Sequence, residues 1–196
     1  MDIAETELMS RYGAFKIYVW NGKPGKEPVV LTTLQLNPSL PVLVRIHSEC
    51  LTGDSFGSQQ CDCGQQKDAS LSLIANSENG IFVYHRAEGR GIGLFHKIKA
   101  YYLQRKFDLD TYDANVQLGF RPDERRYDTL RDIFDKFGIK EVKLITNNLE
   151  KIQEIEKLGV RVVERVPLIV PSNHYNKRYL ETKRVRFGHL LAHEQT

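Results

Sequence analysis

The alternation of helical and strand patterns between residues 129 and 166 most limits how this chain can fold. Residues 130–137 carry apolar side chains at the i, i+3, i+4, i+7 spacing of an amphipathic helix, and a glycine follows. Residues 141–146 and 160–166 are strand-like runs, and residues 152–158 between them have helical spacing. Two strands joined through a helix form a βαβ unit, so we expect parallel pairing with a right-handed crossover.

The rest of the chain predicts further strands and helices in mixed order. β-branched or alternating runs predict strands at Tyr12–Asn21, Pro28–Leu36, Pro41–Glu49 and Gly80–His85, and helices are expected at Gln65–Asn76 and Leu94–Lys106. We therefore expect a mixed α/β (α+β) fold. In it, N-terminal strands form a mixed sheet with helices packed on it, and the βαβ unit lies C-terminal. We expect a single compact domain over residues 1–190 and a flexible tail at 191–196.

Charge and composition exclude several classes of partner and location. The formal net charge is only +3, which does not predict nucleic acid as a partner. No apolar run approaches the roughly 18 residues that span a bilayer, so no membrane is expected. The first residues have neither the basic region nor the apolar run of a signal peptide. An odd cysteine count also favours a reducing compartment, and we expect a cytoplasmic protein.

The only three cysteines, Cys50, Cys61 and Cys63, form a C-x10-C-x-C cluster. Thiolates at this spacing can converge on one metal ion, and three protein ligands leave one position of tetrahedral zinc open for water. The alternative is three small buried thiols that are close only in sequence.

His47 and Glu49 lie just before Cys50 and leave the type of site open. Glu49 is placed to move a proton for a metal-activated water or to bind a substrate donor. His47 as a fourth ligand would make the site structural, although a histidine near a strand end is more often packed or hydrogen-bonded. A His-x-Glu element before cysteines also resembles zinc nucleobase deaminases, but Cys61-Asp62-Cys63 is not their Pro-Cys-x-x-Cys element.

Two polar segments follow expected strands and could contact a nucleotide. Glu88–Gly93 (EGRGIG) offers backbone amides and Arg90 to a phosphate, but it matches neither the P-loop nor the dinucleotide fingerprint, and a tight connection is the alternative. Thr146-Asn147-Asn148 comes directly after the strand-like residues Glu141 to Ile145, at the strand end where ligands of open α/β sheets bind, and Lys151 lies one helical turn further. Helix capping by Asn148 is the competing explanation, and it could coexist with nucleotide binding.

In this order, the motifs resemble GTP cyclohydrolase II, an enzyme of riboflavin biosynthesis. The resemblance extends from Pro41 to Leu191. It is carried by HSECLTGD, FGSQQCDCG, YHRAEGRGIGL, ANVQLGF, DERRY, ITNN, ERVPL, YLETK and GHLL. It implies a homodimer that uses one catalytic zinc ion per subunit, with Mg²⁺ bound alongside the triphosphate of GTP. The implied zinc ligands are Cys50, Cys61 and Cys63.

The resemblance also implies roles for three catalytic residues. Zinc-activated water would attack C8 of guanine, two hydrolytic steps would release formate, and Tyr101 would assist ring opening. Arg125 would attack the α-phosphate and expel pyrophosphate, with Asp123 taking its proton. The implied product is 2,5-diamino-6-ribosylamino-4(3H)-pyrimidinone 5′-phosphate. The positions that align with GTP contacts are Arg45, Ile46, His47, Ser48, Glu49, Gln66, Glu88, Gly89, Arg90, Thr111, Thr146 and Lys151.

The chain departs from the family pattern at a few positions. Gln60 and Lys99 replace arginines, Leu149-Glu150 replaces a proline-containing pair, and one extra residue lies between Lys106 and Thr111. These differences leave a divergent paralogue, such as the related proteins of uracil catabolism, as an alternative. Another zinc-dependent purine hydrolase or deaminase, and a non-enzymatic nucleotide-binding protein with structural zinc, are the others. Tyr101 disfavours variants that stop after one hydrolysis.

Overall fold

The computed structural model of the chain describes residues 2–22 and 25–191, which group into two compact units. Unit 1 comprises Met1–His47, Lys67–Arg86 and Tyr127–Leu168, and unit 2 comprises Ser48–Gln66, Ala87–Arg126 and Ile169–Thr196. Each unit is assembled from three separate stretches of the chain, so no single linker in the sequence separates them. For this reason the sequence predicted one domain. The domain extent of 1–190 stays a prediction, and the expected tail falls mostly on residues 192–196, outside the described residues.

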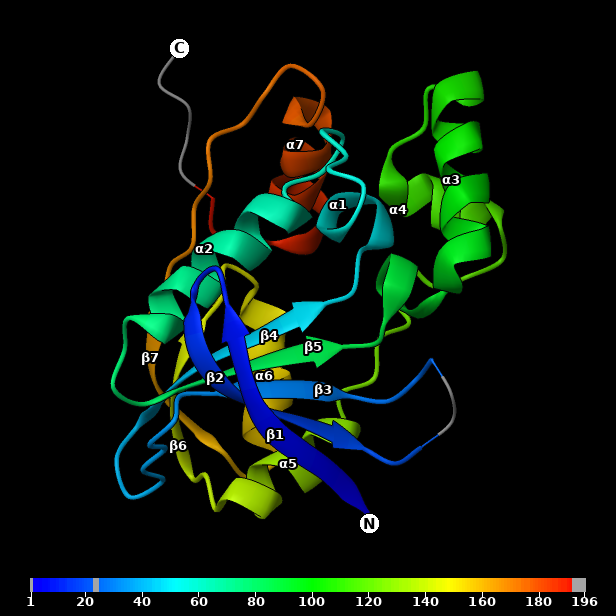
Figure 1. Ribbon diagram of the computed structural model, residues 1–196. Coiled ribbons are helices and arrows are strands. Elements are labelled where there is room, and N and C mark those ends of the chain that lie inside the picture. Colours follow the sequence, from blue (N-terminus) through cyan, green and yellow to red (C-terminus); the bar gives the residue numbers. More distant parts are fainter. Residues whose placement is uncertain (1, 23–24, 192–196) are drawn as a thin grey trace. The chain divides into compact units, whose positions relative to one another are not determined.

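Unit 1 is built on a mixed sheet whose described strands lie in the order β1-β2-β3-β5-β4-β6-β7 (Figure 1). Their bounds are β1 Ile3–Ser10, β2 Gly13–Trp20, β3 Val29–Thr32, β4 Val42–Ser48, β5 Gly80–His85, β6 Glu141–Ile145 and β7 Arg161–Val166. The pairs β1–β2, β2–β3 and β3–β5 are antiparallel, whereas β4–β6 and β6–β7 are parallel. The expected mixed α/β fold with N-terminal strands is confirmed.

Strand β1 was not expected from the sequence. It lies at the edge of the sheet, and most of its side chains are exposed. A strand without a buried face shows no alternation of apolar and polar residues, which is the signal used to find strands. Its pairing with β2, from Ile3 opposite Trp20 to Ser10 opposite Gly13, stabilises it instead.

The βαβ unit has the predicted parallel pairing. Helix α6 (Leu149–Lys157) connects β6 to β7, and the two strands pair in parallel with one irregularity between Val142 and Lys143. Helix α5 (Thr129–Phe137) precedes β6 and ends at Gly138, whose φ of 66° is the left-handed conformation that glycine adopts without strain.

Helices pack against both faces of the sheet, which explains why the central strands β4 and β5 are buried along most of their length. One core cluster joins strand residues such as Trp20 and Val44 to Phe134 of α5 and Ile155 of α6. A second cluster joins strand residues to the part of α2 (Cys63–Ala75) that belongs to unit 1, and includes Ile74. Fully burying one such large side chain contributes about 1.5–3 kcal/mol.

Unit 2 is mainly helical and contains short elements joined by turns (Figure 1). They are α1 Leu51–Asp54, the first residues of α2, the 3₁₀ turn η1 Glu88–Gly91, α3 Gly93–Phe107, α4 Thr111–Gln117 and α7 Lys177–Phe187. Helices α4 and α7 were not predicted; α7 in particular is rich in charged residues and has little apolar periodicity. Throughout the described residues, every helix is too short or too polar to cross a lipid bilayer.

Candidate active site

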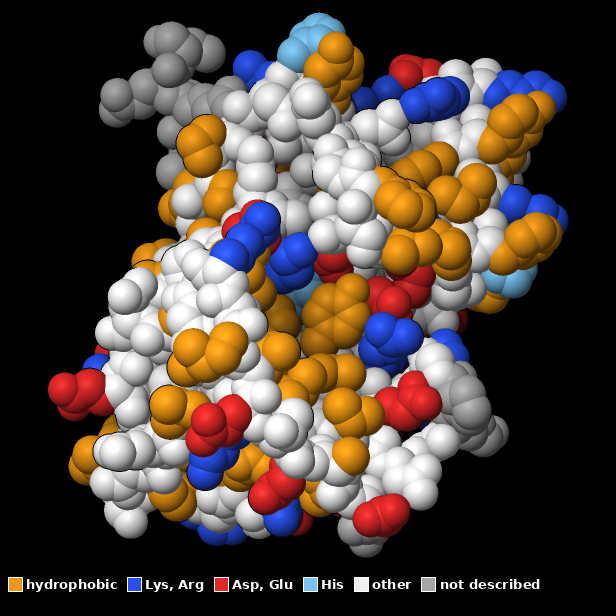
Figure 2. All heavy atoms as spheres, in the orientation of Figure 1, with side chains coloured by type: hydrophobic (Ala, Val, Ile, Leu, Met, Phe, Trp, Pro, Cys, Tyr) orange, Lys and Arg blue, Asp and Glu red, His pale blue; other side chains and the backbone are white. Residues whose placement is uncertain are grey.

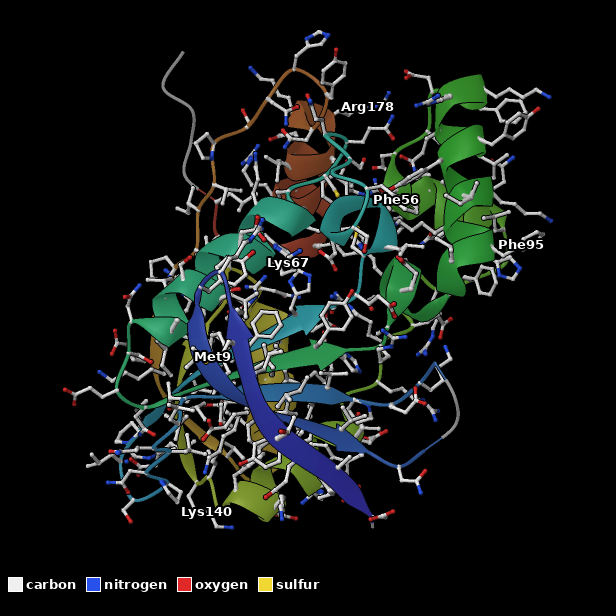
Figure 3. All side chains as sticks on the ribbon, viewed as in Figure 1. Met9, Phe56, Lys67, Phe95, Lys140 and Arg178 are labelled. Atoms are coloured by element: carbon white, nitrogen blue, oxygen red, sulfur yellow. The ribbon has the colours of Figure 1, made fainter. Side chains whose placement is uncertain are left out.

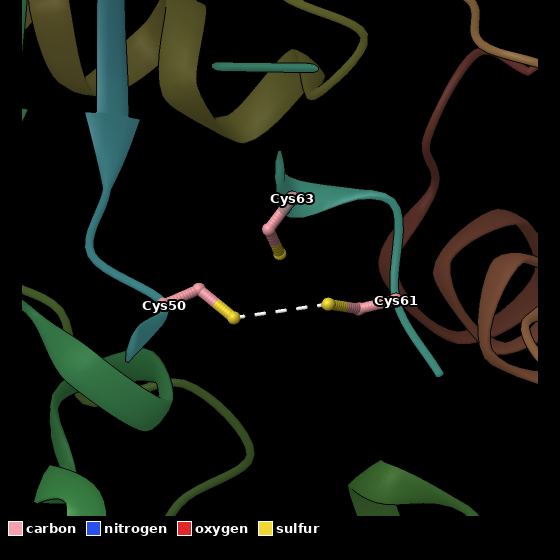
Figure 4. A group of neighbouring side chains, drawn as sticks. All are labelled: Cys50, Cys61 and Cys63. Atoms are coloured by element: carbon pink, nitrogen blue, oxygen red, sulfur yellow. Dashed lines mark hydrogen bonds between the residues drawn. The ribbon is translucent and has the colours of Figure 1, made fainter. Parts of the chain in front are cut away.

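The three cysteines converge in unit 2, although they come from three different local structures (Figure 4). The Sγ atoms of Cys50, Cys61 and Cys63 all lie within 4.8 Å of one another, and those of Cys50 and Cys61 are 3.8 Å apart. Two thiolates bound to tetrahedral zinc at about 2.3 Å would be separated by about 3.8 Å. The Cys50–Cys61 pair therefore already has the spacing that this metal requires, and the Cys63 sulfur lies within 4.8 Å of both.

Local backbone structure places each sulfur. Cys50 follows β4 and is the N-cap residue of α1, whereas Cys63 is the first residue of α2. Gly53 lies among the three cysteines: a Cβ atom there would be 2.9 Å from the Cys61 Sγ, 3.2 Å from the Cys50 Sγ and 3.1 Å from the Cys63 Cβ. A Cβ on Gly64 would be 2.4 Å from the Gly53 carbonyl oxygen. Close packing around the thiols thus explains why the sequence motifs have glycine at Gly53 and Gly64.

The thiols share their protons unequally. Hydrogen bonds from Cys61 and Cys63, and then the charge of Lys97, lower the pKa of Cys50. The contact with Cys50 raises the pKa of Cys61 to about 11 and, together with the contact to Cys61 and burial, raises the pKa of Cys63. One thiolate is therefore favoured without a metal. A divalent cation would replace the remaining protons, and the donor set fits zinc.

Lys97 and Glu88 form a buried ion pair next to this cluster. The Lys97 Nζ lies 2.8 Å from Glu88 Oε1 and 3.2 Å from the Cys50 Sγ. Glu88 also accepts hydrogen bonds from the backbone N–H groups of Leu51 and Gly89, both at 2.7 Å. The pKa of Lys97 is raised: burial opposes this, but the Cys50 thiolate and Glu88 outweigh it. Glu88, predicted to bind substrate, here supports α1 and the lysine.

Tyr101 lies one helical turn after Lys97 on α3. Its hydroxyl hydrogen-bonds Thr52, and burial raises its pKa. Thr52 Oγ1 is in turn 3.6 Å from the Cys50 Sγ. Tyr101 also lines a cavity of about 300 Å³ together with Thr111 at the start of α4. The structure thus connects the predicted catalytic tyrosine to the cysteine cluster.

Asp123 and Arg125 face each other, as their predicted roles require. The Arg125 Nε donates to both carboxylate oxygens of Asp123 at 2.9 and 3.0 Å, and its Nη2 forms a further contact. The Arg125 Nη1 donates to the Ser48 hydroxyl at 3.2 Å. Burial would raise the pKa of Asp123, but the hydrogen bonds and charge of Arg125 lower it overall. Asp123 is therefore ionised and orients the guanidinium.

The glycine-rich turn packs against this pair. Gly89 and Arg90 both have left-handed φ angles, 60° and 59°, and a Cβ on Gly91 would lie 2.8 Å from the Glu124 backbone. The Glu124 N–H donates to the Arg90 carbonyl at 2.9 Å. Burial lowers the pKa of Arg90, which stacks 3.6 Å from the Phe187 ring. Its Nη1 is buried and has no hydrogen-bond partner among the described residues.

The remaining predicted residues of unit 2, Gln66 and Glu49, lie close to the cysteines in the sequence. Gln66 is buried on the first turn of α2, where its Nε2 donates to Asp62 at 2.5 Å. Glu49 is half-buried beside Cys50. The structure therefore groups thirteen predicted site residues in unit 2: Ser48, Glu49, Cys50, Cys61, Cys63, Gln66, Glu88, Gly89, Arg90, Tyr101, Thr111, Asp123 and Arg125.

The other five predicted residues belong to unit 1. Ile46 is fully buried in the sheet core, so only its backbone is available to a ligand. Arg45 donates to the Ile145 carbonyl at 3.1 Å. The His47 ring stacks on Phe82 and Tyr84, with ring centroids 5.8 Å apart in both cases. The candidate ligand group found among the described residues contains the three cysteines alone.

Thr146 and Lys151 are both buried in unit 1. The Thr146 hydroxyl accepts a hydrogen bond from the Asn148 N–H at 3.1 Å, and Asn148 caps α6 by accepting from Glu150 N at 3.0 Å, as the sequence suggested. The Lys151 Nζ donates to the Ile46 carbonyl at 2.9 Å. Roles of these residues toward a substrate stay predictions.

The departures from the family pattern fall on accessible positions. Gln60 is half-buried and lines two cavities, of about 450 and 300 Å³, so its replacement of arginine changes the polarity of their walls. Lys99 is exposed, with its Nζ 4.7 Å from the Phe95 ring. Leu149 and Glu150 form the first turn of α6, a position that would also accept proline.

Sequence reasoning missed three charged residues of this site. Lys97 could have been found, because it lies four residues before Tyr101 and so on the same helix face. Asp62 was noted only as part of the Cys61-x-Cys63 motif. Lys183, which pairs with Asp62 at 2.5 Å, lies on α7, which was not predicted.

Comparison with known proteins identifies the family of the chain. The family model described as GTP cyclohydrolase II matches residues 1–167. The GTP cyclohydrolase-2 of Histophilus somni strain 2336 is 47% identical over 192 residues, covering 97% of this chain and 88% of that protein. The GTP cyclohydrolase-2 of Colwellia psychrerythraea is 46% identical over 186 residues, covering 95% of this chain and 92% of that protein.

Among solved structures, the two-domain 3,4-dihydroxy-2-butanone 4-phosphate synthase RibBX from A. baumannii matches at a TM-score of 0.42 and 14% identity, covering 84% of this chain and 39% of that one. That likeness is too low to add to the assignment. The sequence matches extend over nearly the whole chain and include the three cysteines, Tyr101, Asp123 and Arg125 within the matched residues. The chain therefore belongs to the GTP cyclohydrolase II family of hydrolases.

Proposed function

We propose that the chain hydrolyses GTP to 2,5-diamino-6-ribosylamino-4(3H)-pyrimidinone 5′-phosphate, formate and pyrophosphate, with zinc at Cys50, Cys61 and Cys63. This reaction is the first step of riboflavin biosynthesis. Membership of the family supports hydrolysis of GTP. The observation that carries the proposal is the convergence of three thiols within 4.8 Å, with the half-buried Tyr101 connected to them through Thr52.

The donor set favours a catalytic over a structural metal. Thiolates suit zinc, and three of them leave one coordination position to water. When bound, zinc would supply a Lewis acid that makes water nucleophilic near neutral pH. Mg²⁺ prefers oxygen ligands and is usually held by substrate phosphates, water and one or two carboxylates. We therefore place Mg²⁺ with the triphosphate of GTP.

Two residues of α3 would support ring opening. The raised pKa of Tyr101 keeps its hydroxyl protonated at neutral pH, so it can donate a proton or a hydrogen bond to the opening imidazole ring. Lys97 donates a hydrogen bond to the Cys50 thiolate, which reduces the negative charge on that ligand. Less donation from the thiolate would leave the metal a stronger Lewis acid.

Arg125 and Asp123 would act at the α-phosphate. Asp123 orients the Arg125 guanidinium. Arg90 is a second cation near this pair, since the charges of Asp123 and Arg125 both affect the pKa of Arg90. A covalent role would require Arg125 to transfer a proton to Asp123. Their ordinary pKa values differ by about 9 units, which corresponds to about 12 kcal/mol. Phosphate binding would have to offset much of this difference.

The predicted substrate contacts extend this proposal to guanine and phosphate recognition. The buried, unpartnered Nη1 of Arg90 is a donor that a phosphate oxygen would satisfy. Buried polar groups that pair with the guanine edge would reject adenine, because a mismatched base leaves them unpaired.

We also propose that the chain forms a homodimer. Helix α3 exposes four apolar side chains on one face, namely Leu94, Phe95, Ile98 and Tyr102, which are 39%, 66%, 48% and 58% exposed. Apolar side chains gather over this helix in Figure 2, and Phe95 lies on its outer side in Figure 3. A Phe95→Ser/Ile98→Ser double variant should sediment as a monomer if this face forms the interface, and a dimer of unchanged stability would exclude the face.

The reaction is tested by its products. Protein loaded with zinc is incubated with GTP and Mg²⁺, and formate, pyrophosphate and pyrimidine absorbance are followed together. Absence of all three products would refute the proposal, and formate without diaminopyrimidine would indicate a divergent paralogue. Cys61→Ser should abolish formate release.

Arg125→Ala isolates the phosphate step. The expected result is loss of pyrophosphate release, and normal release would contradict the assigned role. Arg121→Ala is the matched control, because Arg121 is exposed and pairs with Glu124 at the surface. A phosphoguanosyl adduct on Arg125, sought by mass spectrometry of the quenched enzyme, separates covalent attack from charge stabilisation.

A further inference from the structure

Asp62, the residue between two of the proposed metal ligands, forms a buried ion pair with Lys183. Asp62, between Cys61 and Cys63, is fully buried, and the Lys183 Nζ lies 2.5 Å from its Oδ1. The other carboxylate oxygen accepts a hydrogen bond from the Gln66 Nε2 at 2.5 Å. Both oxygens of Asp62 are therefore engaged, and the side chain is held from two directions.

Lys183 belongs to α7, which lies beyond the residues matched by the family model. The helix is attached to other parts of the site as well. Phe187 packs beneath the Arg90 guanidinium, and Arg186 donates to Asp113 of α4 at 2.9 Å. Helix α7 thus connects the metal-binding turn to the glycine-rich turn.

A buried ion pair gives little stability by itself, because removing two charges from water offsets their attraction. Its geometric effect is larger, since a carboxylate held at both oxygens cannot rotate. In a Cys-x-Cys sequence, anchoring the middle side chain restrains the backbone from which both neighbouring sulfurs project. The sulfurs of Cys61 and Cys63 point into the ligand group in Figure 4, while Asp62 bonds Lys183.

We propose that Lys183 is a positioning residue of the metal centre: its ion pair with Asp62 holds the Cys61-x-Cys63 turn in the geometry that binds the metal. The proposal rests on the proposed metal site. It gives a role to the YLETK motif, of which Lys183 is the last residue. Residues that contact the metal ligands but not the metal typically contribute about 10–100-fold to metal affinity.

The test is the zinc affinity of the full-length protein, measured by competition with a chromophoric chelator. Lys183→Met should bind zinc about 10–100-fold more weakly. Lys177→Met is the control, because Lys177 is an exposed lysine on the same helix, and its zinc affinity should be unchanged. A Co²⁺-substituted Lys183→Met protein should also show altered ligand-field bands. Affinity within twofold of the unmodified protein would overturn the proposal.

A second variant covers the case in which Lys183→Met does not fold. Asp62→Asn/Lys183→Met removes both charges, so it leaves no unpaired charge in the interior and should fold. It should still bind zinc about 10-fold more weakly, because the turn has lost its anchor. Unchanged affinity in the double variant would also overturn the proposal. If the unmodified protein binds no zinc, the proposed metal site itself is refuted instead.

Discussion

Replacing Gly53 by alanine should disrupt the metal centre although alanine favours helices. The added Cβ would lie 2.9 Å from the Cys61 Sγ, whereas ordinary contacts begin near 3.4 Å, so the sulfur would move by about 0.5 Å. Metal–ligand distances tolerate only about 0.2 Å. Alanine stabilises a helix by about 1 kcal/mol relative to glycine, but an overpacked side chain destabilises the fold by about 1–3 kcal/mol.

The expected result for Gly53→Ala is a zinc affinity lowered by about 10–100-fold, with formate release lost in proportion. Zinc binding is measured by chelator competition, and thermal unfolding with and without zinc separates metal loss from a folding defect. Gly22→Ala is the matched control: Gly22 is exposed, and its added Cβ would contact nothing closer than 3.9 Å. A Gly53→Ala protein that binds zinc as tightly as the unmodified one would refute the packing argument.

Three further variants test individual residues. Tyr101→Phe should lower kcat for formate release by about 100-fold with little change in KM, since it removes only the hydroxyl; a normal kcat would contradict its role. Lys97→Met should reduce the free energy of unfolding by about 3–5 kcal/mol by leaving Glu88 unpaired in the interior, as urea titration would measure, and a loss below 1 kcal/mol would exclude this. The folded-state pKa of Asp123 is lowered, so its contribution to stability is full above its unfolded pKa and is lost as the pH falls through the folded value. The stability difference between the unmodified protein and Asp123→Asn should therefore shrink below about pH 4, and a difference that grows on acidification would contradict the ion pair with Arg125.

The part of the fold that could be predicted depends on local patterns. Helix α5 and strands β5 and β6 were found because apolar spacing and flanking glycines mark them within a few residues. Strand β1 and helix α7 were missed because their side chains are mostly polar or exposed, and pairing or ion pairs with distant segments stabilise them. Such contacts leave no periodic signal in the sequence.

The same distinction applies to the site. The cysteine cluster could be predicted from spacing, since Cys61 and Cys63 are separated by one residue and Cys50 lies at a strand end. The contacts that surround these cysteines could not be predicted from the sequence. Lys183 contacts Asp62 across 121 positions of sequence. Only the fold shows that this lysine contacts the turn between Cys61 and Cys63.

X-ray absorption at the zinc edge tests the central claim most directly, because it reports the number and type of ligands on the metal. A catalytic site of three thiolates predicts three sulfur atoms at about 2.3 Å and one oxygen at about 2.0–2.2 Å. The Cys61→Ser protein should lose one sulfur from this shell or bind no zinc. A fourth protein ligand in the unmodified protein, such as the imidazole of His47, would close the site to water and contradict the account.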